Sequence, residues 1–220
     1  MAPPRTLSDR SFRKAISVLA ARDPDLADIL TAWGQPPLWT HPPGFPGIVL
    51  DILAQQVSLE SAAAAFAKLE SAVPSITPEH LLALSDRTLK EVGFSRQKAV
   101  YVRSIAGGIL DGSVQLDAVV SLDDEEARGA LLQLQGVGPW TADCYLLFSL
   151  RRADAWPTGD LALIKALEEV KTLPSPLTAR DADAIAESWK PWRSVAARML
   201  WHHYLCSRGR TSSAGIETIG

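Results

Sequence analysis

Apolar residues recur at helical spacing along most of the chain, and no segment alternates long enough to predict a β-strand. Near the N-terminus, Phe12, Ala15, Ile16 and Leu19 stand at positions i, i+3, i+4 and i+7, which places them on one face of a helix. A proline follows Asp23 directly, as at the first turn of a second helix. The pattern therefore predicts an all-α protein.

A segment rich in proline and glycine, GQPPLWTHPPGFPG, interrupts this periodicity. Its five prolines and three glycines exclude regular structure, so it predicts a linker between the N-terminal helices and a central lobe. Helical spacing then resumes in a segment that ends near Gln56 and in another that follows Ser58. Later helices are expected at about Ser95–Leu110, Asp123–Leu134, Pro139–Leu150, Asp160–Glu169, Ala179–Glu187 and Pro191–Cys206. Short helices joined by tight loops favour a compact arrangement of two lobes.

Composition narrows the class of protein. Hydrophobic residues make up 47% of the 220, which is enough to bury a substantial core. The first residues lack the apolar run of a signal peptide, and no later stretch is long enough to cross a membrane, so we expect a cytoplasmic protein that makes no membrane contact. Cys144 and Cys206 lack the paired spacing of a metal site, and we expect no metal or other cofactor.

The charge balance limits how the chain can bind nucleic acid. A net charge of -3 and a pI near 5.8 argue against a protein that coats nucleic acid by bulk electrostatics. Any binding to DNA must therefore depend on a small local site for phosphate, and that site must be visible in the sequence.

The sharpest local signal is LLQLQGVGPWTADCYLLFSL, in which an apolar helix ends at a Gly-Val-Gly turn and a second helix begins at once. Gly136 and Gly138 allow the backbone to approach a ligand closely, and the amides at the start of the next helix favour a phosphate. Such a grip needs no large positive charge. Arg96 and Lys98 stand at another glycine-led helix start and offer a second phosphate contact. An ordinary helix C-cap explains the same glycines, so the turn alone leaves both readings open.

Four segments together resemble the helix-hairpin-helix DNA glycosylases. LQGVGPWTAD is similar to their hairpin, and a carboxylate follows about twenty residues later in WPTGDLAL. ILAQQVSLESAA and WKPWRSVAARMLW resemble, more narrowly, the alkyladenine branch typified by the bacterial 3-methyladenine DNA glycosylase II. The resemblance covers roughly Pro46 to Tyr204.

The resemblance implies a two-lobed all-α fold with the active-site cleft between the lobes. Residues 1–45 and 151–207 are then expected to form one lobe, residues 46–150 the central lobe with the hairpin, and residues 208–220 a flexible tail. The activity it implies is hydrolysis of the N-glycosidic bond of alkylated purines of the 3-methyladenine and 7-methylguanine type, which leaves an abasic site in double-stranded DNA. We expect the protein to act as a monomer, associated with the nucleoid when bound to DNA.

The resemblance assigns the catalytic carboxylate to Asp160. Cleavage of the bond between purine and sugar develops positive charge on the deoxyribose, which a carboxylate stabilises while it orients the attacking water. Its own neighbours suggest a different role, because an Asp between Pro-Thr-Gly and LALIKAL is typical of a helix N-cap, and the two roles are compatible. Asp51 and Asp143 are weaker alternatives, since one lies far from the hairpin in sequence and the other within its second helix.

Relatives that also nick the strand carry a lysine just after the hairpin, where its amine forms a Schiff base with the sugar. Trp140 occupies that position in this chain. An indole cannot form this adduct, so the resemblance implies base removal by water without lyase activity. The cysteine cluster that holds an iron-sulfur centre in some relatives is also absent from the sequence.

The remaining site residues follow from the same resemblance. Trp140 and Trp201 correspond to aromatic walls of the base pocket, where an electron-rich face attracts a cationic purine. Cys144 replaces a tyrosine of some relatives, with Tyr145 as its neighbour. Gln56 corresponds to the side chain that fills the gap left by a flipped nucleotide. The residues expected at the DNA are Gln55, Gln56, Arg96, Lys98, Gly136, Val137, Gly138, Thr141 and Lys165.

Two other interpretations remain open from the sequence. The acidic pI and the altered pocket are compatible with a noncatalytic protein that binds DNA structure through the hairpin. A helical scaffold whose motifs are coincidental is the third possibility, and it predicts no salt-sensitive binding to DNA.

Overall fold

The structure is a computed structural model that describes residues 6–210. In this part of the chain the regular structure is helical, apart from an isolated β-bridge between Thr6 and Arg152. The all-α expectation is therefore confirmed. The last ten residues of the predicted tail lie outside the described residues, whereas Arg208 in its first part pairs with Glu169 and lies over the ring of Tyr204.

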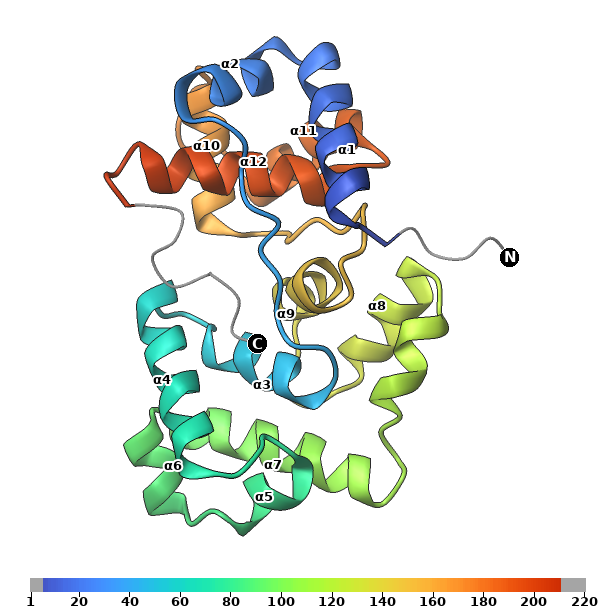
Figure 1. The fold of residues 1–220 in the computed structure, drawn as a ribbon, viewed down its shortest axis with the longest axis vertical. Coiled ribbons are helices and arrows are strands. Elements are labelled where there is room, and N and C mark those ends of the chain that lie inside the picture. The colour runs from blue at the N-terminus through green and yellow to red at the C-terminus, as the bar shows by residue number, and fades with distance from the viewer. Residues whose placement is uncertain (1–5, 211–220) are drawn as a thin grey trace.

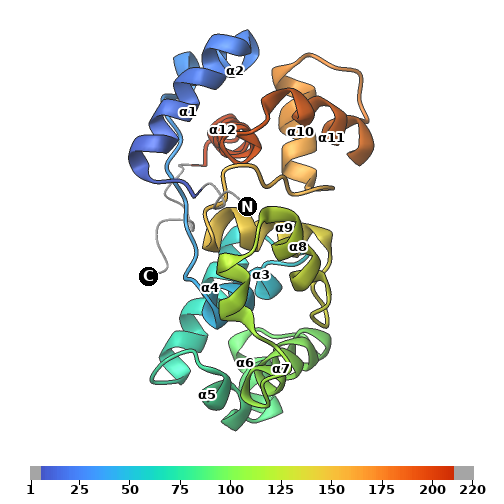
Figure 2. The same cartoon turned by 90° about the vertical axis from the view of Figure 1, so that its right-hand side faces the viewer.

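The helices pack as two groups that the chain enters, leaves and re-enters (Figures 1 and 2). The upper group contains α1 (Asp9–Arg22), α2 (Pro24–Trp33), α10 (Leu161–Val170), α11 (Ala179–Ala186) and α12 (Arg193–Cys206). The lower group contains α3 (Phe45–Leu53), α4 (Leu59–Ala72), α5 (Pro78–Ala83), α6 (Asp86–Val92), α7 (Arg96–Leu110), α8 (Asp124–Leu132) and α9 (Pro139–Cys144). Short 3-10 turns cover Leu116–Ser121 and Glu187–Trp189.

Side-chain caps explain why so many short helices begin where they do. At most helix starts a Ser, Thr or Asp side chain accepts a hydrogen bond from a backbone N–H of the first turn, and each such cap contributes about 1 kcal/mol. The capping residues are Ser8, Asp23, Ser58, Thr77, Ser85, Ser95, Asp123, Asp160 and Thr178.

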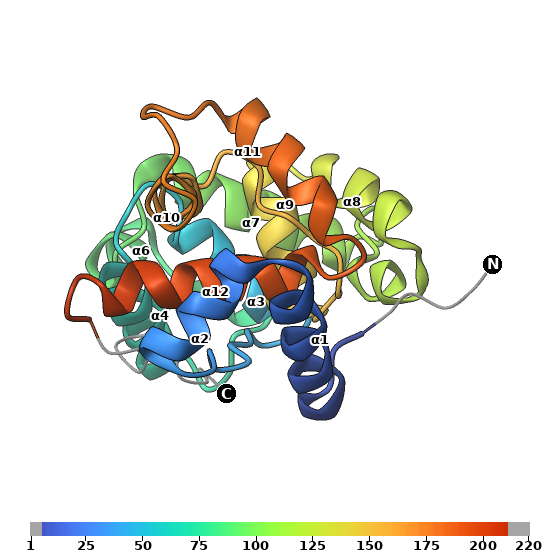
Figure 3. The ribbon, with the colours of Figure 1, turned by 90° about the horizontal axis from the view of Figure 1, so that it is seen from above.

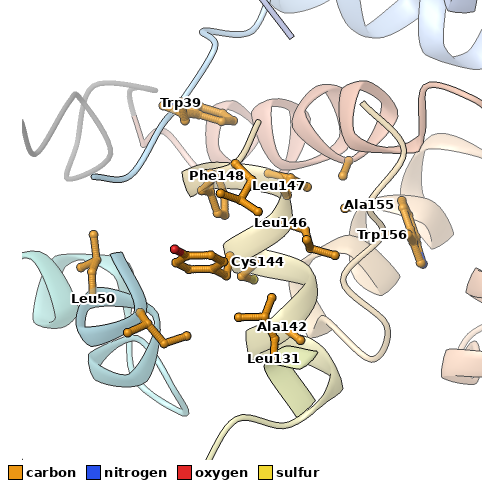
Figure 4. Close-up of a cluster of buried hydrophobic side chains, with 14 of the residues drawn as sticks. Trp39, Leu50, Leu131, Ala142, Cys144, Leu146, Leu147, Phe148, Ala155 and Trp156 are labelled. Atoms are coloured by element: carbon orange, nitrogen blue, oxygen red, sulfur yellow. The ribbon is translucent and has the colours of Figure 1, made fainter. Parts of the chain in front are cut away.

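The hairpin helix α9 is the element that joins the two groups. It is expected as one helix to Leu150, but the α-helical part ends at Cys144 and a π-helical turn continues over Tyr145–Ser149. From Thr141 to Leu150 every residue is buried, and Figure 4 shows Cys144, Leu146, Leu147 and Phe148 between the lower helices and α12.

Arg198 of α12 fastens the proline-rich linker to this element. Figure 3 shows α12 running through the upper group, with α2 on one side and α10 on the other. The Arg198 guanidinium is fully buried and donates to the carbonyl oxygens of Trp39 in the linker (3.0 Å) and Leu147 (2.9 Å). It also lies 5.5 Å from the centre of the Phe148 ring. One buried cation therefore holds the linker and the end of the hairpin helix against the upper group.

Among the described residues, no helix combines the length and apolar character that crossing a membrane requires.

Candidate active site

A cavity of about 850 Å³ lies where the two groups of helices meet. Its lining combines Gln55 and Trp140 from the lower group with Asp160 and Trp201 from the upper group. The volume falls in the range of sites that enclose a small organic ligand. The hairpin and the carboxylate that the sequence separates by about twenty residues therefore line one space.

Asp160 is held in place by three N–H donors. As the N-cap of α10, it accepts a hydrogen bond from the backbone N–H of Leu163 at Oδ1 (2.8 Å). The indole Nε1–H of Trp140 donates to Oδ2 (2.8 Å), and that of Trp201 donates to Oδ1 (3.2 Å). The capping role suggested by the sequence is therefore present, and the same carboxylate also faces the cavity with both oxygens oriented.

Trp140 and Trp201 also hold the carboxylate of Asp160, a role that the sequence does not show. Both line the cavity, as expected, but their N–H edges are bonded to Asp160. Trp201 continues a row of stacked rings, with Phe148 at a centroid distance of 5.3 Å and His41 a further 4.4 Å from Phe148. Sequence reasoning missed Phe148, although its place eight residues after Trp140 and four after Cys144 is a helical repeat along the hairpin helix.

The side chains of Cys144 and Tyr145 lie in different surroundings. Cys144 lines the cavity, and burial raises the pKa of its thiol well above the ordinary value, so it faces a ligand as a neutral group. Tyr145 is fully buried and outside the cavity lining, and its hydroxyl accepts a hydrogen bond from the backbone N–H of Gly44 (3.1 Å). Its predicted place in the pocket is therefore corrected, because the side chain anchors the linker instead.

Gln55 and Thr141, both expected at the DNA, form hydrogen bonds that support the hairpin. The Gln55 side-chain amide donates to the carbonyl oxygen of Gly136 (2.9 Å) and to the Thr141 hydroxyl (3.0 Å). Val137 is also withdrawn from the surface, since its side chain is buried and its N–H donates to Leu134. The side chains of these three residues thus support the hairpin, and their predicted places at the DNA remain predictions.

The two hairpin glycines differ in their surroundings. Gly136 has φ +83°, and a Cβ there would lie 2.1 Å from a ring carbon of Tyr101, so glycine is needed by the fold itself. At Gly138 φ is -92° and a Cβ would meet no atom within 4 Å. The space beside Gly138 is therefore open, which leaves it accessible to a ligand strand.

Lys98, expected to hold a phosphate, forms hydrogen bonds within the protein and lines the cavity. Its Nζ donates to the carbonyl oxygens of Leu53 (2.7 Å) and Gln55 (2.9 Å), beyond the last turn of α3, and burial lowers the pKa of its ammonium group. Two of its three N–H donors are therefore engaged within the protein, and the predicted phosphate contact remains a prediction. Gln56, which follows Gln55 in the chain, is exposed at the cavity rim. Its φ is +56°, a conformation that few residues other than glycine adopt.

The other two basic residues lie outside the cavity lining. Arg96 is exposed at the first position of α7, and Lys165 pairs with Glu168 (3.0 Å) on α10. Their predicted contacts with DNA remain predictions.

Of the two alternative acids, Asp51 and Asp143, one lines the cavity and the other does not. Asp143 is buried in a two-point pair with Arg128 (2.6 and 3.1 Å) and does not line the cavity, so its role is structural. Asp51 does line the cavity, although the sequence ranks it low because it is far from the hairpin. Its Oδ1 lies 2.9 Å from Nδ1 of His41, and its side chain is 1% exposed.

Within residues 6–210 no group of three or more His, Cys, Asp or Glu side chains is arranged to hold a metal ion.

A glycine hairpin in one lobe, and a carboxylate fixed across an interlobe cavity in the other, define a helix-hairpin-helix protein with an acid-containing site. The chain belongs to the HhH-GPD superfamily of base excision DNA repair proteins, whose family model matches residues 49–193.

Known relatives and solved structures agree with this membership. The chain is 26% identical over 200 residues to the alkylbase DNA glycosidase-like protein mag2 of Schizosaccharomyces pombe, which covers 88% of this chain and 94% of that protein. It is 30% identical over 126 residues to DNA-3-methyladenine glycosylase 2 of Escherichia coli, covering 57% of this chain and 42% of that protein. The structure of S. pombe 3-methyladenine DNA glycosylase (Mag1) in complex with abasic DNA superposes with a TM-score of 0.79 at 26% identity, covering 86% and 95% of the two chains. The chain spans less than half the length of several bacterial relatives that it matches.

Proposed function

We propose that the protein is a monofunctional DNA glycosylase, which hydrolyses the N-glycosidic bond of alkylated purines in double-stranded DNA and leaves an abasic site. The observation that carries this proposal is the carboxylate of Asp160, held by the indoles of Trp140 and Trp201 at a cavity beside the hairpin. Relatives named as 3-methyladenine glycosylases support the choice of lesion class. We further propose that the protein acts as a monomer on chromosomal DNA.

The site divides the reaction between its residues. A flipped purine enters the cavity, where the aromatic faces attract the positive charge that alkylation places on the base. As the bond to the base breaks, positive charge develops on the sugar, and the fixed carboxylate of Asp160 stabilises it. Water then adds to the anomeric carbon. An alkylated base departs as a neutral molecule, so this step needs no acid on the base.

The first test is a strand-break assay on an alkylated duplex. Incubation with the protein followed by heating in alkali is expected to break the strand at the modified purines. A noncatalytic binder leaves the strand whole while it still retards the duplex in a gel, and a scaffold protein does neither.

We predict that Gly138→Ala weakens binding of an abasic-site duplex by about tenfold, because its methyl group enters the space that a DNA strand occupies beside the hairpin. Thermal unfolding stays unchanged, since that Cβ meets no protein atom within 4 Å. The matched control is Gly129→Ala on α8, where a Cβ also meets no atom within 4 Å but the residue is outside the cavity. Fluorescence anisotropy measures the affinity, and equal affinities for the two variants would place the strand elsewhere.

We also predict that borohydride traps no covalent complex with abasic DNA. Trp140 offers no amine, and Nζ of Lys98, which does line the cavity, is bonded to two carbonyl oxygens. A trapped band on a denaturing gel that disappears in Lys98→Met would instead reveal a lyase that uses this lysine.

A further inference from the structure

A histidine and an aspartate that the proposed mechanism does not use also line the cavity. Asp51 of α3 is 1% exposed. Its Oδ1 forms a hydrogen bond of 2.9 Å with Nδ1 of His41 in the linker. Its other oxygen, Oδ2, has no hydrogen-bond partner among the described residues. An ionised carboxylate buried with so little support is costly.

Burial favours the protonated form of Asp51. It raises the pKa of Asp51 above the ordinary value, in spite of the opposing effect of His41. A protonated Asp51 is therefore favoured, and its hydroxyl donates the 2.9 Å hydrogen bond to Nδ1 of His41. Because Nδ1 then accepts, the imidazole carries its hydrogen on Nε2.

The imidazole of His41 is fixed in position but accessible. It stacks on Phe148 at a centroid distance of 4.4 Å and an interplanar angle of 21°, and Phe148 stacks on Trp201, whose indole holds Asp160. The His41 side chain retains 14% of its exposure, and no described residue forms a hydrogen bond with its Nε2. His41 therefore presents one N–H donor to the cavity that also contains Asp160.

We propose that His41 is a general acid for the departing base, and that Asp51 is the residue that positions it. The inference rests on the proposed glycosylase activity and extends it to neutral damaged purines, such as deaminated ones. In the proposed step the bond between C1′ and the purine nitrogen breaks, and its electron pair goes to the purine. The proton on His41 Nε2 moves to a ring nitrogen or carbonyl oxygen of the purine while the proton of Asp51 moves to Nδ1. Water then adds to C1′, and the proton that this water loses returns to the pair, which restores the starting state.

The charge of the damaged base distinguishes a general-acid role of His41 from a purely structural role. A purine methylated at N3 or N7 is cationic and leaves as a neutral molecule, whereas an uncharged purine leaves as an anion unless it is protonated. Loss of a general acid therefore slows release of the uncharged purine most. Loss of cavity shape slows both.

The test compares wild type with His41→Phe, which keeps a ring against Phe148 and removes the donor. Release of hypoxanthine and of 7-methylguanine is measured in single-turnover reactions on duplexes of the same sequence. We expect hypoxanthine release to fall by about 100-fold and 7-methylguanine release to stay within about threefold of wild type. His80→Phe on α5, outside the cavity, is the matched control and leaves both rates unchanged.

Each other outcome overturns the inference. An equal loss for the two bases assigns His41 a structural role only, and unchanged rates assign it none. Release of 7-methylguanine but not hypoxanthine by the wild type removes this inference and leaves the proposed function intact, whereas release of neither base removes both. If His41→Phe does not fold, as judged by thermal unfolding, His41→Gln replaces it, because its amide donates a hydrogen bond but transfers no proton; a hypoxanthine rate equal to wild type then rejects the general acid.

Discussion

We predict that replacing Asp160 with Asn slows release of alkylated purines by about 10³-fold, while the variant still binds an abasic-site duplex. The neutral amide cannot stabilise the positive charge that develops on the sugar. It also has one acceptor oxygen, so at least one of the two indole donors, Trp140 or Trp201, loses its partner. Single-turnover release of 7-methylguanine measures the rate, and fluorescence anisotropy measures the binding.

The choice of Asn separates catalysis from capping. Asn and Asp are equivalent helix N-caps, so the loss of free energy of unfolding is expected to be only about 1 kcal/mol, from the indole hydrogen bond and not from the cap. Asp9→Asn, at an exposed position in the first turn of α1, controls for the loss of one charge. An Asp160→Asn protein that keeps more than about a tenth of wild-type activity contradicts the assignment. Asp51 is then the acid to test next, because it lines the same cavity.

We predict that replacing Arg198 with Ala lowers the free energy of unfolding by about 4 kcal/mol. The change empties the space of a fully buried side chain and removes the donor to the carbonyl oxygens of Trp39 and Leu147. Because those contacts hold the linker that carries His41, excision is expected to fall as well.

Urea denaturation measures this loss of stability. Arg87→Ala is the control, since that side chain is 88% exposed in its pair with Glu91 and is expected to contribute less than about 1 kcal/mol. Similar midpoints for the two variants would show that Arg198 does not fasten the linker.

The helices and the hairpin could be predicted from the sequence because their signals are local. Apolar spacing of three and four residues marks the buried faces, and Ser, Thr or Asp marks the helix starts. The N-cap signal at Asp160 and the glycine turn are both of this kind, and the structure brings them to one cavity. For Asp160 the local reading and the family resemblance are compatible, because the capping geometry itself fixes the carboxylate.

The contacts that complete the site could not be predicted, because they join segments far apart in sequence. Lys98 stands beside a glycine-led helix start, which suggests a phosphate contact. The fold also brings the end of α3 against it, where two backbone carbonyl oxygens accept two of its three N–H donors. His41 reads as part of an irregular linker until α3 places Asp51 beside it. Periodicity reports which face of a helix is buried, but not which distant segment covers it.

The most direct test of the account is mass spectrometry of the bases released from methylated genomic DNA. If Asp160 and the hairpin form a glycosylase site, free 3-methyladenine and 7-methylguanine accumulate with time in the wild-type reaction and stay at background with Asp160→Asn. Methylated bases that remain in the DNA, although the protein binds it, would contradict the account.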